Sequence, residues 1–152
     1  MPPDMTAGFP DAAARLVAAT DTIGARALGD ALENTAGMRE RYDEHGLRLL
    51  LRDTQVMVER VAMSVASGDP LWTREWTDWV APVYRRRRVP MDDVAAVMQG
   101  VRRAAAALLS EDERVPMNAA MDEAIAVLRY HRRFSGDARR RNPIVDAIYK
   151  GA

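Results

Sequence analysis

The sequence predicts an all-α protein, a bundle of about five to six helices with no β-sheet. Three observations lead to this prediction. Apolar residues recur at steps of three and four along most of the chain, which is the spacing of one face of a helix. Proline, serine and aspartate stand at the expected helix starts, and glycine stands at expected ends. No stretch alternates apolar and polar residues as a half-buried strand does.

The length of 152 residues suits one helical domain, which we place at residues 11–135. Residues 1–10 are expected to be a disordered lead, and residues 136–152 a basic tail with a short helix. The lead has acids and prolines where a signal peptide has positive charge and an apolar run, which favours a cytoplasmic location. The longest apolar run is far shorter than the ~20 residues that span a bilayer, so no membrane helix is expected.

The first two helices are expected on either side of a break at residues 34–37. The first begins near Pro10 or Asp11, since proline fits the first turn and aspartate complements the helix dipole. The second, over residues 38–66, is strongly amphipathic. Its apolar stripe consists of Leu47, Leu50, Leu51, Thr54, Val58, Val61 and Val65.

The third helix is expected over residues 70–87, after the turn Gly68-Asp69-Pro70. Glycine suits the left-handed end of one helix, and Asp-Pro suits the start of the next. Pro82 lies inside this helix, where it removes a backbone hydrogen bond. A kink or a break is therefore expected there.

All three tryptophans lie on this third helix. Trp72, Trp76 and Trp79 are spaced i, i+4 and i+7, so they form one aromatic stripe, which Val83 continues. The stripe faces either the core or the wall of an apolar ligand cavity, and both interpretations predict burial. The candidate pocket residues are Trp72, Trp76, Trp79, Val83, Met98 and Val101.

Two more helices are expected after the third. Pro90 with two following aspartates starts the fourth, which carries its apolar residues from Val94 to Leu108. Ser110 and Glu113 then form a capping-box pattern, which opens a fifth helix over residues 111–134. The fourth helix is expected to pack beside the tryptophan stripe.

The residue types present exclude several chemistries. Cysteine is absent, which excludes disulfides, thiolate metal sites, a cysteine nucleophile and thioether attachment of a haem or a bilin. The sequence contains none of the phosphate-binding loops or hydrolase motifs that we sought. Its acidic pairs fall in first turns of helices, where the dipole accounts for them. We therefore predict a protein that is not an enzyme and has no metal and no resident cofactor.

His45 and His131 are the only histidines, and they lie on different expected helices. Imidazole is a common axial ligand of haem, so a haem held between them is one alternative. Another tetrapyrrole, held without covalent attachment, is a related alternative. The simpler interpretation is that both histidines cap helices or face solvent.

Two arginine clusters form a candidate patch for an anion or a partner: Arg85, Arg86, Arg87, Arg88, Arg139, Arg140 and Arg141. A DNA-binding regulator using these residues is the other alternative. The whole chain has 22 basic and 22 acidic residues, so it lacks the excess of charge typical of DNA-binding domains. Cations at a helix C-terminus are also favoured by the dipole alone. The balance of charge argues against nucleic acid.

The order of features between Arg41 and Leu128 resembles the N-terminal helical domain of the RsbT co-antagonist proteins, the sensors of bacterial stressosomes. A long helix rich in leucine and valine is followed by Gly68-Asp69-Pro70, and an aromatic helix has Trp79 before the next loop. The next turn is Arg88-Val89-Pro90, followed by Asp92-Asp93-Val94, and the helix after it ends at Leu109-Ser110-Glu111.

This resemblance implies a globin-like fold without haem that forms a homodimer through its long helices. It also implies a non-enzymatic role in signalling, in which the domain passes a stress or ligand signal to a protein partner. The output domain of that family is missing after Ala152. We therefore expect a stand-alone sensor module that acts by dimerisation and by binding a ligand or a partner.

Overall fold

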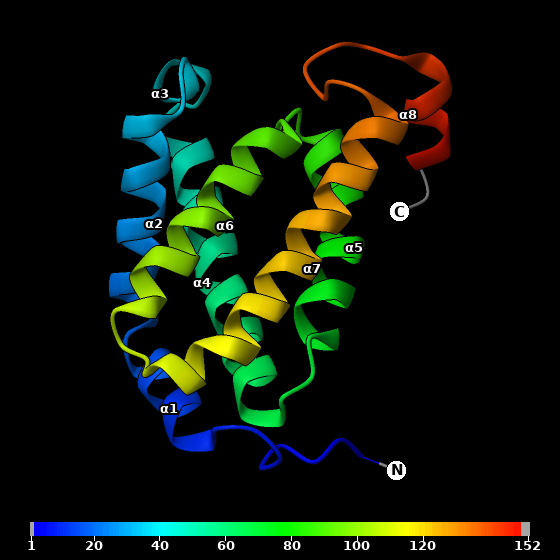
Figure 1. Ribbon diagram of the computed structural model, residues 1–152. Coiled ribbons are helices and arrows are strands. Elements are labelled where there is room, and N and C mark those ends of the chain that lie inside the picture. The colour runs from blue at the N-terminus through cyan, green and yellow to red at the C-terminus, as the bar shows by residue number, and fades with distance from the viewer. Residues whose placement is uncertain (1, 150–152) are drawn as a thin grey trace.

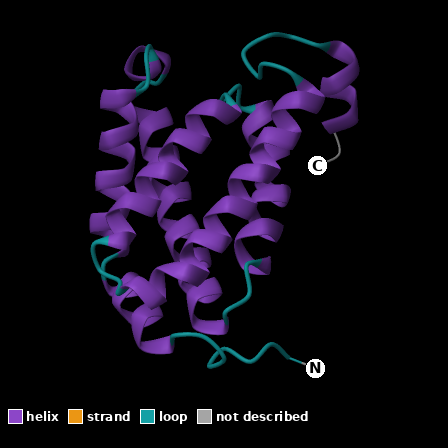
Figure 2. Cartoon of the chain, in the orientation of Figure 1, coloured by secondary structure: helices purple, strands orange, loops and turns teal. Residues whose placement is uncertain are grey.

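The computed structural model describes residues 2–149, and these form eight helices with no strand (Figures 1 and 2). The predicted all-α class is therefore confirmed. The helices are α1 (Pro10–Ala18), α2 (Thr20–Asn34), α3 (Met38–Arg41), α4 (Glu44–Ser67), α5 (Leu71–Arg86), α6 (Met91–Ala106), α7 (Glu111–Ser135) and α8 (Pro143–Tyr149). No helix within the described residues is long and apolar enough to cross a membrane.

Helix α4 lies at the centre of the bundle and packs against α1, α2, α5 and α7 (Figure 1). Helix α2 packs on α6, and α7 packs on both α5 and α6. Each of these helices contributes buried apolar side chains to one common core. The short α8 lies beside α5 at the other side of the bundle from α2 (Figure 1).

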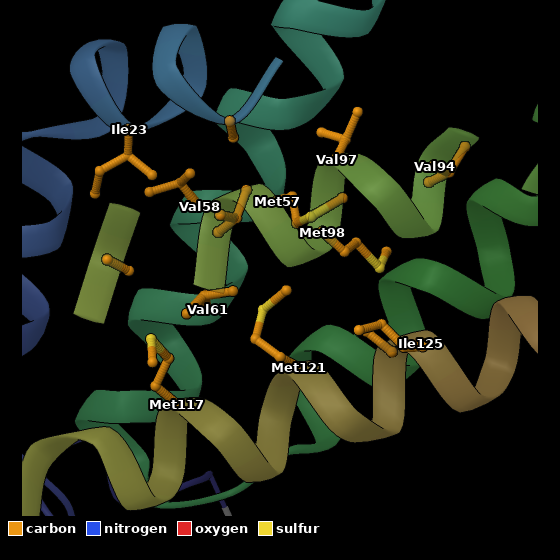
Figure 3. Packing of buried hydrophobic residues seen from close by; sticks show 14 of the residues in the cluster. Ile23, Met57, Val58, Val61, Val94, Val97, Met98, Met117, Met121 and Ile125 are labelled. Carbon is orange, nitrogen blue, oxygen red and sulfur yellow. The ribbon is translucent and has the colours of Figure 1, made fainter. Parts of the chain in front are cut away.

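The core is made largely of valine and methionine. Met57, Val58 and Val61 of α4 meet Met98 of α6 and Met121 of α7 (Figure 3). All five are buried. Unbranched methionine adapts its shape to irregular gaps, so it fills the space between these three helices.

Gly100 allows α2 and α6 to approach closely. A Cβ atom placed on Gly100 would lie 2.7 Å from the backbone oxygen of Ala27. No side chain fits at that distance without moving one of the two backbones. Glycine at this position of α6 therefore brings the two helices into backbone contact.

Two expected helices are each divided in the structure, which accounts for eight helices instead of six. The first breaks at Ala19 between α1 and α2. The second breaks at Tyr42, whose backbone is extended, and restarts after Asp43. The Asp43 carboxylate accepts a hydrogen bond from the Gly46 N–H at 2.8 Å, which makes Asp43 an N-cap within the expected helix.

Helix α5 continues through Pro82, so the break expected there is absent. The proline costs one hydrogen bond to the carbonyl of Asp78, an exposed residue near water. The turn before α5 agrees with its prediction, since Gly68 has a φ of 74° and its N–H donates to the Ser64 carbonyl.

The start of α7 is the predicted capping box. Ser110 accepts a hydrogen bond from the Glu113 N–H, and the Glu113 carboxylate accepts one from the Ser110 N–H at 2.9 Å. Arg15 of α1 also donates to this carboxylate at 2.7 Å. The Arg15 guanidinium and the Ser110 N–H lower the pKa of Glu113 to about 2. One carboxylate therefore joins α1 to the beginning of α7.

The structure places part of the expected disordered lead on the bundle. The Gly8 and Phe9 N–H groups donate to carbonyls at the end of α4, each at 2.8 Å, and the Phe9 ring packs against the core. Met1 and the last three residues of the tail lie outside the described residues. Within the tail, the short helix is α8, and it buries Val145.

Candidate ligand-binding site

The buried face of α5 is not the tryptophan stripe. It consists of Thr73, Thr77, Val80 and Tyr84, which are also spaced i, i+4, i+7 and i+11. This stripe is displaced by one residue, or about 100°, from the tryptophans. Thr73 Oγ1 donates to the Ala120 carbonyl of α7 at 2.7 Å. Small hydroxyl side chains thus let α5 pack tightly on α7, and the tryptophans are turned away from this contact.

The tryptophans line an open cleft between α4 and α5 with a volume of about 520 Å³. Trp72 and Trp76 are half-buried, and Trp79 is 69% exposed, so the burial expected for the stripe does not hold for Trp79. We call this hollow the tryptophan cleft. Its lining residues are Asp53, Val56, Arg60, Trp72, Glu75, Trp76, Trp79 and Val80.

Three charged side chains accompany the tryptophan rings. Asp53 and Arg60 come from α4, and Glu75 comes from α5. The Asp53 carboxylate accepts a hydrogen bond from Arg87 Nη2 at 2.9 Å, which holds it at the cleft. Arg60 Nη1 lies 4.0 Å from the sulfur of Met63, a weak contact that leaves the guanidinium free to bind an anion. The cleft thus offers flat apolar surfaces together with charges of both signs.

Tyr84 contacts Arg87, the residue that holds Asp53 at the cleft. The Arg87 guanidinium lies 5.3 Å above the Tyr84 ring, within the range of a cation–π contact. Burial raises the pKa of the Tyr84 hydroxyl well above its usual value, and the nearby Asp53 carboxylate adds to this effect. The phenol therefore stays neutral, and Arg87 is fixed between Tyr84 and Asp53.

The other candidate pocket residues lie elsewhere. Met98 and Val101 of α6 are fully buried in the core and do not line the cleft. Val83 is partly buried against the core. The prediction that the stripe faces α6 is therefore wrong. Helix α4, and not α6, forms the opposite wall of the cleft.

The structure does not bring the two histidines to a common site. His131 of α7 is buried and its Nε2 lies 3.0 Å from the Asp78 carboxylate of α5. His45 is exposed and lines a separate hollow beside Arg41 and Arg88. In the described part of the chain, no cluster of three or more histidine or acidic side chains could hold a metal ion.

The structure brings the ends of the two arginine clusters together, since Arg86 and Arg141 line one hollow, but the seven side chains do not share one surface. Arg85 is buried at the end of α5, and Arg87 is paired with Asp53. Arg139 pairs with Asp137 at 2.7 Å within its own loop, and its guanidinium holds the pKa of Asp137 well below the usual range. Arg86, Arg88, Arg140 and Arg141 are exposed. A nucleic-acid surface made of all seven side chains is therefore not present.

Comparison with protein-family models relates the chain to known proteins. Residues 10–128, more than half of the chain, match the model described as Phycobilisome protein. The chain belongs to the phycobilisome protein family. No curated protein matches it significantly. The family has a globin-like fold, so this part of the fold prediction is confirmed, although we took it from another family.

The family match overturns the proposed kinship with stressosome sensors. The features used for that resemblance, such as a Gly-Asp-Pro turn and a Pro-Met-Asp-Asp helix start, are general signs of helix boundaries. The predicted role in stress signalling is therefore wrong, and a signalling partner is unsupported. Phycobilisome proteins are light-harvesting structural proteins that oligomerise into assemblies, and they are not enzymes.

The prediction of no cofactor is corrected as well, because phycobilisome proteins bind bilins, which are open-chain tetrapyrroles, by a covalent bond. This chain does not fit that attachment. A thioether needs a cysteine sulfur, and the sequence contains none. The tryptophan cleft does fit a bilin held without such a bond, because it combines aromatic walls with Arg60 and two carboxylates.

Sequence analysis missed the α4 wall of the cleft. Asp53, Val56 and Arg60 recur at steps of three and four, immediately beside the core stripe of Thr54, Val58 and Val61. A second stripe of mixed polarity next to an apolar one was the available signal. It could not show that this stripe and the tryptophans face each other, because helix packing decides that.

Proposed function

We propose that the protein is a tetrapyrrole-binding member of the phycobilisome family that holds an open-chain pigment in the tryptophan cleft without a covalent bond. The observation that carries this proposal is the gathering of all three tryptophans around Arg60, Asp53 and Glu75. The absence of cysteine supports the non-covalent form of binding. When bound, such a pigment would supply absorption of visible light.

The cleft suits the body of such a pigment. An open-chain tetrapyrrole is a long, flat, conjugated molecule that is apolar on both faces. Three indole rings on one side of α5 offer flat surfaces on which it can stack. The cleft volume of about 520 Å³ lies within the range typical of sites for ligands of this size, about 300–1,000 Å³.

The charges suit its polar groups. The carboxylate side chains of a bilin match the planar guanidinium of Arg60, which can donate two parallel hydrogen bonds. Its pyrrole N–H groups need acceptors, and Asp53 and Glu75 supply carboxylate oxygens on opposite walls of the cleft. Asp53 keeps acceptor capacity after its bond from Arg87.

Titration with biliverdin, an open-chain tetrapyrrole, tests this proposal. Because every tryptophan of the chain lines the cleft, binding there should quench most of the intrinsic fluorescence and change the visible spectrum of the pigment. Denaturation should release the pigment, since no covalent bond holds it. Replacing Arg60→Met should weaken binding by about tenfold, through loss of a charge-assisted hydrogen bond.

Arg52→Met is the matched control, because Arg52 is an exposed arginine of α4 that does not line the cleft. It should leave the affinity for biliverdin unchanged. The proposal fails if biliverdin leaves both the visible spectrum and the tryptophan fluorescence unchanged. Equal losses in the two variants would mean that the pigment binds only to surface charge.

We also propose that the chain forms a homodimer through the exposed apolar residues of α7 and α8. The rings of Tyr130 and Phe134 stack with their centroids 6.4 Å apart, and Ile144 and Ile148 are exposed nearby in sequence. Exposed apolar groups of this kind mark association surfaces. Sedimentation of a Tyr130→Ser, Phe134→Ser variant should then show a monomer. The cytoplasmic location stays a prediction from the sequence.

A further inference from the structure

Arg85 is a buried cation whose hydrogen-bonding groups are mostly unused. Its side chain lies at the end of α5, and only 3% of the residue is exposed. Nη2 donates to the Arg140 carbonyl at 3.2 Å. Within the described residues, Nε and Nη1 have no hydrogen-bond partner. A guanidinium carries five N–H donors and is strongly disfavoured in a dry site unless they are satisfied.

Arg41 shows how the same chain satisfies a partly buried arginine. Its Nε and Nη2 donate to the two oxygens of Asp93 at 2.9 and 2.5 Å, a bidentate pair. Among the described residues, the carboxylate beside Arg85 is that of Asp146 of α8, and its Oδ1 lies 3.7 Å from Nε. That distance is too long for a hydrogen bond. Arg85 thus lacks the pair of oxygens that Arg41 has.

A hollow of about 170 Å³ lies at this point, and its lining residues are Arg85, Arg86, Arg88 and Asp146. Within the described residues of this lining, the Asp146 carboxylate is the one acidic group beside Arg85 and Arg88. A second hollow, lined in part by Arg141, shares Arg86 and Asp146 with the first. The cavity has both an excess of positive charge and unused donors along its wall.

We propose that this hollow, between the end of α5 and α8, binds a small oxyanion of the phosphate type. The anion would accept hydrogen bonds from Arg85 Nε and Nη1 and be neutralised further by Arg88. The Asp146 carboxylate would compete with this anion, because it lies beside the same guanidinium groups. Its Oδ1 is nevertheless too far from Arg85 Nε for a hydrogen bond. This site is distinct from the tryptophan cleft, with which it shares no lining residue.

Calorimetric titration of the full chain with inorganic phosphate tests this inference, with chloride used to keep the ionic strength constant. Saturable binding of one phosphate per chain is expected. Asp146→Asn should strengthen binding several-fold, because it removes the competing negative charge. Arg85→Met should weaken it by at least about tenfold, since charge-assisted hydrogen bonds are lost.

Arg88→Met is a second variant, to be used if Arg85→Met does not fold. Arg88 is exposed, so its replacement should leave the helix content unchanged. It should also weaken phosphate binding. Arg129→Met, an exposed arginine of α7, is the control and should have no effect. The inference is overturned if neither the natural protein nor Asp146→Asn binds phosphate, if acetate binds more tightly than phosphate, or if Arg129→Met matches Arg88→Met.

Discussion

Helices α5 and α6 have the same length of 16 residues and both are amphipathic, yet they use their large side chains in opposite ways. On α6 the apolar stripe of Val94, Val97, Met98 and Val101 is buried. On α5 the most apolar stripe lines an open cleft, and a stripe with two threonines is buried. Large apolar side chains thus mark the core face of α6 but the cleft face of α5.

The sharpest test of this contrast is a truncation on α6. Met98→Ala should lower the free energy of unfolding by about 2–5 kcal/mol, because it leaves a cavity among Met57, Val61 and Met121. Chemical denaturation followed by circular dichroism measures the change. A loss below about 1 kcal/mol would mean that α6 is not the core helix that the structure indicates.

The close contact of α6 with α2 gives the next largest effect. Gly100→Ala should cost about 1–3 kcal/mol, because the added Cβ meets the Ala27 backbone. Gly29→Ala on α2 is the matched control, since a Cβ there meets nothing within 4 Å. That variant should gain about 0.5–1 kcal/mol from higher helix propensity. Thermal or urea unfolding of both variants should therefore give opposite signs.

The buried threonines of α5 are expected to matter less than the core of α6. Thr73→Val keeps the shape of the side chain but removes its donation to the Ala120 carbonyl, which should cost about 0.5–1.5 kcal/mol. Thr22→Val, at an exposed position of α2, should be nearly neutral. Equal effects of the two replacements on urea unfolding would show that the hydroxyl of Thr73 does not hold α5 to α7.

The smallest effect on stability is expected for the largest side chain. Trp79→Ala should change the free energy of unfolding by no more than about 0.5 kcal/mol, because the residue is 69% exposed. The same variant should bind biliverdin more weakly, as judged by the visible spectrum of the pigment. A loss of about 3–5 kcal/mol on unfolding, which is typical of a buried tryptophan, would instead mean that the stripe belongs to the core.

The boundaries that could be predicted are those that local chemistry decides. Gly68, Ser110 and Glu113 form their turn or cap through groups within a few residues, so their patterns are visible in one dimension. The helix break at Asp43 was not predicted, because this N-cap lies inside a continuous apolar pattern. A kink or a break was expected at Pro82, but α5 continues through it and packs along α7.

Only one wall of the candidate site could be predicted from the sequence. The tryptophans were identified from their spacing, but their partners Asp53 and Arg60 lie on another helix and are named by no motif. Which of two adjacent stripes faces inward on α5 depends on the fit of Thr73 and Thr77 against α7. That fit is a property of two surfaces together, so the periodicity of one helix does not contain it.

The pairing of α2 with α6 and of α1 with α4 sets the order in which the chain can fold during synthesis. The first two helices contact one another little, and their partners are made later. The ion pair between Arg15 and Glu113 forms late, since Glu113 follows Arg15 by 98 residues. An emerging chain folds as units become complete, so α1 and α2 can pack on α4 first, and α2 gains its second partner only when α6 has left the ribosome.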